Sequence, residues 1–528
     1  MTDAYPRLSP FGPVHLPAPT GAESAEWDRI AIEDIGVPQA VLMENAGRGT
    51  AEVVQRLFPT GPVLALVGSG NNGGDALVCI RTLVAWGREV RAILVSDRTH
   101  EDPLLHGWAV ETVTDRDLSD DEWTRLFQEA DVVIDGVLGT GVRDRPRDRQ
   151  ADAILRANRA ECPILSIDVP SGVDANTGAV PGEAIEASVT VTYGAPKLGS
   201  LLHPARRNVG RLVAIDIGFP PTETSMSHMF SGQIVTPAWA YAHRPLRSTD
   251  THKNAVGRVL VIAGQAGMAG AALLAARAAY HAGAGFVRVC SPEENRAVIQ
   301  SSLPEAVFVA AEDVEGLREG LEQADAALIG PGMGTEAPGR VLLDVVAEGP
   351  SVPLVVDADG LNLAAEGAID LAALAKDRPI LATPHVREMA RLLHTEHDVV
   401  IEDRLAALRE AADRFGHAVL LKGAPSLVTG VGRPILVDTQ ATSDLAVAGM
   451  GDALAGVCTS LMAQGVSDVD AGALGLFFSG RAARIAGRGV SLTPSDVVRW
   501  LPSAMNEHGA ADSDLALGGL LFDAEAAR

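Results

Sequence analysis

Runs of apolar residues alternate with amphipathic stretches along most of this chain. A first series predicts buried strands at residues 62–67, 90–95, 132–134, 164–167, 189–192 and 212–215, with a helix at 75–86. A second series predicts strands at 259–263, 286–290, 326–329, 354–356, 380–382 and 419–421, with a helix at 271–281. Because these strands are continuously apolar, they are typical of parallel sheets that are covered on both faces.

The pattern lapses between residues 219 and 250, where two prolines and scattered Thr, Ser and Met indicate a linker. With 528 residues, the chain is also too long for one hydrophobic core. We therefore predict two α/β domains, residues 1–222 and 228–508, and a C-terminal tail at 509–528 that carries no strong signal. Ligand-binding residues of such sheets gather at the carboxyl ends of the strands.

Composition excludes several classes of partner. The formal net charge of −25 argues against nucleic-acid binding, which needs a basic face. No stretch of about 18 uncharged apolar residues is present, so we expect no membrane span. No signal peptide is visible, and the four cysteines lie far apart without CxxC spacing, which favours buried thiols in the reducing cytoplasm.

Lysine is unusually rare in this sequence. Of 43 basic residues only four are lysines, namely Lys197, Lys253, Lys376 and Lys422. A compact ammonium group and a planar guanidinium group do different work. The four lysines are therefore candidates for roles that arginine cannot fill.

The turn after the first predicted strand reads GSGNNGGD, residues 68–75. Its glycines fit GxGxxG, and Asp97 follows the next strand at the distance of a ribose-binding acid. An NAD-dependent oxidoreductase is therefore one alternative. That motif, however, does not require the oxygen-bearing side chains of Asn71, Asn72 and Asp75.

Other strand ends add more oxygen ligands. One strand ends in Asp135, and another leads into Asp168-Val169-Pro170-Ser171. At a shared sheet edge, Asn72, Asp135 and Ser171 would supply neutral oxygens and a single negative charge. Such a set suits a weakly charged hard cation better than zinc, which prefers nitrogen and sulfur.

NNGGD, D-x-x-x-GTG, D-x-PSG and an earlier MENAG make residues 25–219 resemble the NAD(P)H-hydrate epimerase family. The resemblance implies a Rossmann-like three-layer α/β/α fold and a potassium ion at Asn72, Asp135 and Ser171. It also implies substrate contacts at Asn71, Asn72, Gly73, Gly74, Asp75, Gly139, Thr140, Gly141, Val142, Arg143, Asp144, Arg145 and Asp168.

The chemistry of such a substrate suggests a catalytic group. The hydrate carries a hydroxyl on a carbon bonded to the ring nitrogen, and this centre can epimerise by reversible ring opening or hydroxyl loss. Both routes need an acid/base group beside that oxygen. We predict Asp168 in this role, with Lys197 as its electrostatic partner.

In the second domain, Ala448-Gly449-Met450-Gly451-Asp452 opens an apolar helical stretch. The two glycines leave backbone N–H groups unhindered at a helix start, where a phosphoryl group is stabilised. Asp452 beside them can accept a proton from an attacking hydroxyl. The pattern predicts phosphoryl transfer with Asp452 as the general base.

GPGxG, DADxLN, TPHxxE, LKG and GxGD follow an HK pair, His252-Lys253, in an order that makes residues 228–505 resemble the ribokinase-like NAD(P)H-hydrate dehydratases. The resemblance implies a ribokinase-like α/β fold that uses ADP with magnesium. Implied hydrate contacts are Ala271, Gly332, His385 and Asp452. Implied nucleotide contacts are Lys422, Gly423, Ala424, Pro425, Ser426 and Gly451. The sequence departs from the family pattern at Met450 and at Ser443-Asp444-Leu445.

Together the two resemblances imply a bifunctional repair enzyme for nicotinamide nucleotides. One half would interconvert the R and S forms of hydrated NADH and NADPH. The other would dehydrate the S form with ADP, giving AMP and phosphate. The small-molecule partners would be these hydrates and ADP, in a cytoplasmic homo-oligomer for which a tetramer is favoured.

Two alternatives concern the second half. A small-molecule kinase of ribokinase-like fold, fused to a dinucleotide-binding domain, shares the GxGD logic but would leave a stable phosphoester. A catalytically dead ligand sensor would bind the hydrate without turnover.

Overall fold

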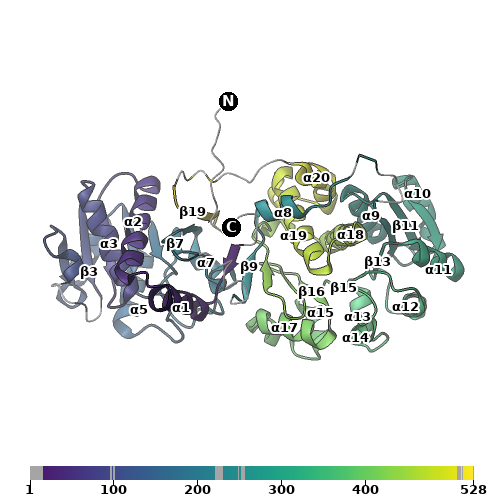
Figure 1. Cartoon of the computed structure of the whole chain (residues 1–528), viewed down its shortest axis with the longest axis horizontal. Coiled ribbons are helices and arrows are strands. Elements are labelled where there is room, and N and C mark those ends of the chain that lie inside the picture. Colours follow the sequence, from purple (N-terminus) through teal and green to yellow (C-terminus); the bar gives the residue numbers. More distant parts are fainter. Residues whose placement is uncertain are drawn as a thin grey trace. The chain divides into compact units, whose positions relative to one another are not determined.

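A computed structural model describes residues 16–95, 98, 102–220, 230–247, 249–250, 256–507, 513, 515 and 517–526. Asp97 and the His252-Lys253 pair lie outside the described residues. The chain divides into two compact units (Figure 1). Unit 1 comprises Met1–Gln233 and Ala511–Arg528, and unit 2 comprises Ile234–Ala510. Both are built from helices and sheets, which confirms the predicted α/β class.

The sheet of unit 1 runs in the order β19-β8-β7-β6-β5-β2-β3-β4. Its strands are β2 (Val63–Val67), β3 (Val90–Leu94), β4 (Glu111–Thr114), β5 (Val132–Gly136), β6 (Ile164–Ile167), β7 (Val189–Tyr193), β8 (Arg211–Ile215) and β19 (Leu520–Ala524). All pair in parallel except β19, which is antiparallel to β8. The strand order reverses between β2 and β5, and ligands bind at such a switch point.

Helices cover both faces of this sheet, as the continuously apolar strands require. Leu77 and Ile80 of α3 belong to the core on one face, and Phe127 and Ile154 belong to the core on the other. The longer helices are α1 (Gly21–Arg29), α2 (Gln39–Leu57), α3 (Asn71–Ala85), α4 (Asp120–Glu129) and α5 (Asp148–Arg159). Two short ones, α6 (Leu198–Leu201) and α7 (Arg206–Val209), follow β7.

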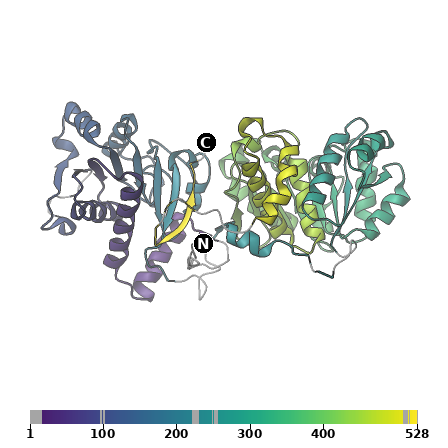
Figure 2. The same cartoon turned by 90° about the horizontal axis from the view of Figure 1, so that it is seen from above.

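The segment predicted to be a tail, residues 509–528, includes a strand of unit 1. Its strand β19 pairs with β8, and in Figure 2 it lies, in yellow, beside the teal strands of the same sheet. The Arg211 guanidinium donates to both carboxylate oxygens of Asp523 at 2.6 and 2.9 Å. The sequence interpretation missed this strand because β19 is half-buried and short, and so lacks a long apolar run.

The strands that lie wholly in unit 2 run in the order β18-β17-β16-β15-β14-β13-β10-β11-β12. They are β10 (Arg258–Ile262), β11 (Phe286–Ser291), β12 (Val307–Ala310), β13 (Ala326–Ile329), β14 (Leu354–Val356), β15 (Ile380–Ala382), β16 (Ala418–Leu421), β17 (Leu427–Thr429) and β18 (Ile435–Val437). The strands β10 to β16 all pair in parallel with their neighbours in this group. The pairs β16–β17 and β17–β18 are antiparallel. The switch point of this sheet falls between β10 and β13.

Two helical layers enclose this second sheet (Figure 1). One core contains α9 (Ala269–His281), α18 (Met450–Ala463), α19 (Asp468–Ala486) and α20 (Pro494–Asn506). The opposite core contains residues of α11 (Val314–Gln323), α12 (Ala337–Glu348), α13 (Asp359–Ala365) and α14 (Leu371–Leu374). The remaining helices are α8 (Pro237–His243), α10 (Arg296–Ser302), α15 (Val386–Leu393), α16 (His397–Glu402) and α17 (Arg404–Phe415).

Candidate functional site

In unit 1, the three residues expected to hold a cation are linked by hydrogen bonds, two of them through one backbone carbonyl. The Asn72 Nδ2 donates to the Leu138 carbonyl at 2.7 Å, and the Ser171 hydroxyl reaches the same carbonyl at 3.2 Å. That hydroxyl also donates to Asp135 at 2.5 Å. The strand ends after β2, β5 and β6 thus meet at the switch point and form an oxygen-rich cluster.

Asp135 in this cluster is a fully buried carboxylate. It accepts hydrogen bonds from the hydroxyls of Ser166 and Ser171 and from two backbone N–H groups, but no Lys or Arg among the described residues pairs with it. Burial raises its pKa even though these hydrogen bonds favour the charged form. The cluster therefore fits a monovalent hard cation, which would supply the missing positive charge.

Asp168, the predicted acid/base residue, is held by several donors. The Lys197 Nζ donates to its Oδ1 at 2.5 Å, and the Thr192 hydroxyl and the Tyr193 N–H donate at 3.1 and 3.2 Å. Asp168 also has a φ of 63°, an unfavourable conformation for a residue other than glycine. Backbone strain of this kind persists only where its surroundings fix it, and it clusters at functional sites.

The charge of Asp168 acts on two further carboxylates, those of Asp75 and Asp28. Burial raises the pKa of Asp75 well above its usual range, and the charges of Asp168 and Asp28 add to this shift. Burial by surrounding protein raises the pKa of Asp28 to about 6, although part of that residue is exposed to solvent. Asp28 was missed in the sequence because it lies in a helix far from any glycine motif.

The first residue of the loop at 139–145, Gly139, lies close to Asn72. A Cβ added at Gly139 would lie 3.3 Å from that of Asn72. Farther along, Arg143 donates to the carbonyls of Thr140 and Val142 and forms an ion pair with Asp174, while Arg145 donates to the Pro181 carbonyl. Both guanidinium groups thus bind the protein's own loops in this structure.

The remaining predicted contacts of unit 1 lie along the start of α3. Asn71 is exposed at the first helical position, where its Oδ1 accepts a hydrogen bond of 3.5 Å from Gln39. Asn72, Gly73 and Gly74 are buried in the same turn. The helix begins at Asn71 rather than near the predicted residue 75, because the glycines of NNGGD are part of its first turn.

In unit 2, the strand ends bring a second lysine–aspartate pair together. The Lys422 Nζ donates to the buried Asp357 at 2.7 Å and lies 3.9 Å from Glu388. Burial alone would lower the pKa of Lys422, but these two carboxylates raise it. The ammonium group therefore stays charged at the base of the site.

Asp452 lies beside this pair at the start of α18. Burial raises its pKa to about 6, the charge of Asp357 adds to the shift, and Lys422 opposes it. The N–H groups of Gly451 and Asp452 make no hydrogen bond within the described residues. A Cβ added at Gly451 would lie 3.2 Å from the Lys422 Nζ. The free N–H groups, the ammonium and the carboxylate thus face one region.

The predicted hydrate contacts fall on both sides of Asp357. A Cβ added at Gly332 would lie 3.2 Å from that of Ala271, so these two residues face each other. His385 lies at the N-terminus of α15, where its Nδ1 accepts the N–H groups of Arg387 and Glu388. Burial and the charge of Lys422 lower its pKa, which favours the neutral ring that can accept these bonds.

Arg404 forms hydrogen bonds with the loop that is predicted to bind the nucleotide, residues 422–426. Its guanidinium donates to the carbonyls of Ala424 and Pro425 at 3.0 and 2.8 Å. The Ser426 hydroxyl donates to the Gly423 carbonyl at 3.1 Å. Arg404, Asp357 and Glu388 were absent from the predicted site. The last two stand in the DADxLN and TPHxxE motifs, which were the available signal.

The described residues contain neither a membrane-spanning helix nor a cluster of metal-ligating side chains. No helix there is long and apolar enough to cross a membrane. No group of three or more His, Cys, Asp and Glu side chains that could hold a metal ion occurs there either. The oxygen-rich cluster of unit 1 contains only one carboxylate, Asp135, and is therefore not a group of this type.

Two family models match the sequence. One, described as YjeF-related protein N-terminus, matches residues 39–199, and the other, described as NAD(P)H-hydrate dehydratase, matches residues 259–502. Among solved structures, a ribokinase-like superfamily protein from Enterococcus faecalis covers 52% of this chain and 95% of its own, with 25% identity and a TM-score of 0.48. An ADP/ATP-dependent NAD(P)H-hydrate dehydratase from Bacillus subtilis, co-crystallised with ATP/Mg²⁺, covers 50% and 95%, with 23% identity and a TM-score of 0.44.

Curated relatives match across both units. The bifunctional NAD(P)H-hydrate repair enzyme of Salinibacter ruber is 36% identical over 93% of this chain and 96% of its own length. The enzymes of the same name from Moorella thermoacetica and Escherichia coli are each 34% identical, over 89% and 87% of this chain. Since these relatives align with nearly the whole chain at this identity, the chain belongs to the family of bifunctional NAD(P)H-hydrate repair enzymes.

Proposed function

We propose that unit 1 interconverts the R and S forms of hydrated NADH and NADPH, and that unit 2 dehydrates the S form at the expense of ADP. The observation that carries the proposal is the geometry around Asp452, where a carboxylate with a raised pKa lies beside free helix N–H groups and a charged lysine. Family membership supports both activities.

In unit 2, Asp452 accepts the proton of the hydrate hydroxyl as that oxygen attacks the terminal phosphorus of ADP. The bond between that phosphorus and AMP breaks, and the N–H groups of Gly451 and Asp452 stabilise the charge on the moving phosphoryl group. The phosphate ester is a better leaving group than hydroxide, so phosphate departs with the electron pair of the carbon–oxygen bond, and the ring nitrogen stabilises the positive charge that is left. Loss of a proton from the neighbouring ring carbon then restores the ring double bond. We assign the nucleotide to Lys422–Ser426 and Gly451, the hydrate to Ala271, Gly332 and His385, and magnesium to the ADP phosphates.

In unit 1, Asp168 is the acid/base group, and Lys197 orients it by donating a hydrogen bond to its Oδ1. Asn72, Asp135 and Ser171 would hold a potassium ion, which would supply a positive charge beside the buried Asp135. We assign the epimerase contacts to 71–75 and 139–145. The enzyme is further proposed to be a cytoplasmic homo-oligomer, with a tetramer favoured, and the free state of all four cysteines supports a reducing compartment. Sedimentation velocity tests the assembly.

The test incubates the purified chain with mixed hydrate epimers and ADP, ATP or neither, and follows recovery of reduced-nicotinamide absorbance. Asp452→Asn should abolish recovery, whereas the exposed Asp344→Asn on α12 is a matched control that should not. Asp168→Asn, or choline in place of potassium, should leave one epimer behind. Formation of a stable phosphoester with no recovery would instead favour the small-molecule kinase, and binding without turnover the sensor.

A further inference from the structure

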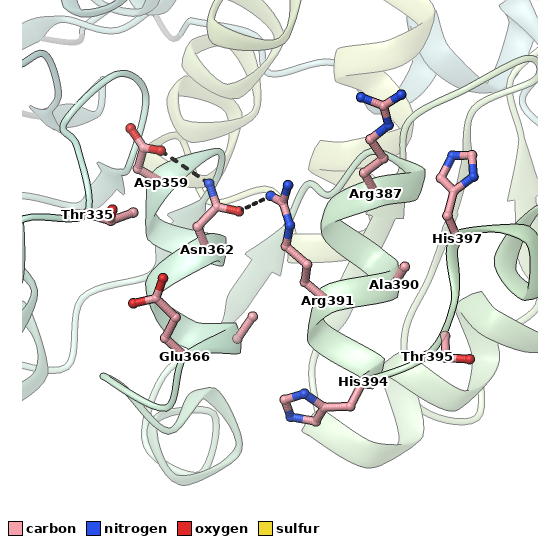
Figure 3. A pocket seen from close by; sticks show the side chains of 11 residues that line it. Thr335, Asp359, Asn362, Glu366, Arg387, Ala390, Arg391, His394, Thr395 and His397 are labelled. Atoms are coloured by element: carbon pink, nitrogen blue, oxygen red, sulfur yellow. Dashed lines mark hydrogen bonds between the residues drawn. The ribbon is translucent and has the colours of Figure 1, made fainter.

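A pocket of about 760 Å³ lies between α13 and α15 in unit 2 (Figure 3). Asp359 and Asn362 of α13 line it together with Glu366, which follows that helix, and Arg387 and Arg391 of α15 line it together with His394, which follows α15. Figure 3 shows Asp359 and Arg387 at one end of the pocket and Glu366 and His394 at the other. Asp359 lies three residues after the end of β14 and two residues after Asp357. The end of the pocket that contains Asp359 is therefore next to the Lys422–Asp357 pair.

The acidic residues of this pocket already have partners. Asp359 accepts hydrogen bonds from the Gly334 N–H at 2.9 Å and from Asn362 at 3.2 Å. Glu366 forms an ion pair with Arg340 on α12. Among the described residues, neither carboxylate forms an ion pair with an arginine of α15.

The two arginines, in contrast, have no acidic partner within the described residues. Arg391 donates to the Asn362 Oδ1, a neutral acceptor, at 2.6 Å. The Arg387 side chain makes no hydrogen bond or ion pair with a described residue. In a chain with a net charge of −25, two such guanidinium groups in one pocket form a ready site for phosphate oxygens, which they bind in pairs.

The position of the pocket in the sheet relates it to one of the two ligands. The strand order is β16-β15-β14-β13-β10, and the proposed hydrate contacts lie after β15 (His385), β13 (Gly332) and β10 (Ala271). The pocket is lined by residues that follow β14, and β14 lies between β15 and β13 in the sheet. The pocket therefore lies next to the proposed hydrate contacts. The loop assigned to the nucleotide follows β16, on the other side of His385. The hydrate is also a dinucleotide, whose second half needs room beyond the reacting ring.

We propose that this pocket binds the adenosine monophosphate half of the hydrated dinucleotide, with Arg387 and Arg391 on the phosphate that this half carries. The inference rests on the proposed function and adds a binding site for the part of the substrate that does not react. Contacts to such a remote part can raise the rate at the reacting ring.

The test compares the hydrate of NADH with the hydrate of reduced nicotinamide mononucleotide, which lacks the adenosine monophosphate half. In Arg387→Met and Arg391→Met, the advantage in kcat/KM of the dinucleotide over the mononucleotide should fall by about tenfold or more, the effect of one charge-assisted hydrogen bond. Arg318→Met on α11, whose side chain is half-exposed, is the matched control and should keep the full advantage.

Two outcomes would overturn the inference. An equal loss with both hydrates would mean that the arginines act on α15 itself. A rise in the KM for ADP instead would assign the pocket to the nucleotide. If the wild-type chain turned over neither hydrate, the proposed function would fail, and binding of NADPH measured by calorimetry would still test the pocket. Arg391→Met should weaken that binding at least tenfold, and equal binding would also overturn the inference.

Discussion

Two of the four lysines form buried or half-buried pairs with an aspartate, one in each unit. Lys197 is paired with Asp168, and Lys422 with Asp357. A compact ammonium group fits these narrow positions, where the fork of an arginine would need more space. Lys376 lines a pocket on the opposite side of unit 2, and Lys253 lies outside the described residues.

Variants of the Lys197–Asp168 pair can distinguish its effect on the stability of unit 1 from its role in epimerisation. Asp168→Asn leaves an uncompensated ammonium that is only 2% exposed, so the free energy of unfolding of unit 1 should fall by about 3 kcal/mol. Adding Lys197→Met removes that charge and should restore most of the loss, while epimerisation stays absent. Calorimetry of the unit 1 transition, paired with the epimer assay, measures both. Restored epimerisation in the double variant would exclude Asp168 as the acid/base group.

The raised pKa of Asp452 predicts the pH dependence of dehydration. The residue accepts a proton only when ionised, so log kcat/KM should fall with unit slope as the pH drops below about 6. As the pH rises above that value, the ionised fraction of the carboxylate increases from one half toward one, and the profile should level off. Initial rates with saturating ADP between pH 5 and 8 give the profile. A flat profile down to pH 5 would show that a different group takes the proton.

Much of the site could be predicted from the sequence because its residues follow directly after apolar strands. Asn72 and Ser171, for example, reach the same carbonyl, and Ser171 also bonds Asp135, although the three residues are far apart in the chain. Asp28 and Arg404 could not be predicted in this way. They reach their sites from helices, and only the packing of those helices brings them near.

At the scale of elements, the start of α18 combines the proposed catalytic carboxylate with a space that only glycine leaves open. Gly449 has a φ of 88°, and Gly451 faces the Lys422 ammonium. The first turn of this helix therefore presents its N–H groups without a side chain in front of them.

Gly451→Ala tests this turn. The added methyl would lie 3.2 Å from the Lys422 Nζ and 3.8 Å from Asp357, so the KM for ADP should rise at least tenfold. The fold should not suffer, because alanine is favoured over glycine inside helices by up to about 1 kcal/mol. Gly270→Ala in the first turn of α9, where nothing lies within 4 Å of the added methyl, is the control. An unchanged KM for ADP in Gly451→Ala would place the nucleotide elsewhere.

The elements themselves were predictable to different degrees. Strands such as β2 and β13 are buried at every position and match their apolar runs closely. Helix starts were less predictable, as α3 shows, because glycines and asparagines suit both a loop and a first turn. The short α8 and the half-buried β19 escaped notice because neither has a long apolar stretch.

At the scale of the molecule, unit 1 contains residues from both ends of the chain. Strand β19 extends its sheet beyond β8, and Arg206 adds a hydrogen bond to the Glu525 carbonyl at 2.6 Å. Unit 2 is thus an insertion into unit 1 along the chain.

Truncation after residue 510 should therefore affect the two units unequally. Unit 1 loses β19 and the Arg211–Asp523 pair, so its melting temperature should drop by several degrees, at about 2–4 °C per kcal/mol for a domain of this size. The transition of unit 2 and the dehydratase rate should stay the same. Scanning calorimetry with both activity assays checks this. Equal shifts in both transitions would contradict the division into units.

The antiparallel strand β19 also bears on how the protein is made. A ribosome releases residues 234–510 before it releases the strand that completes the sheet of unit 1. The dehydratase half can therefore mature on the nascent chain while the epimerase half waits with an open edge at β8. Such an edge can pair with other chains, so β8 is exposed to mispairing until β19 covers it and becomes the edge of the sheet.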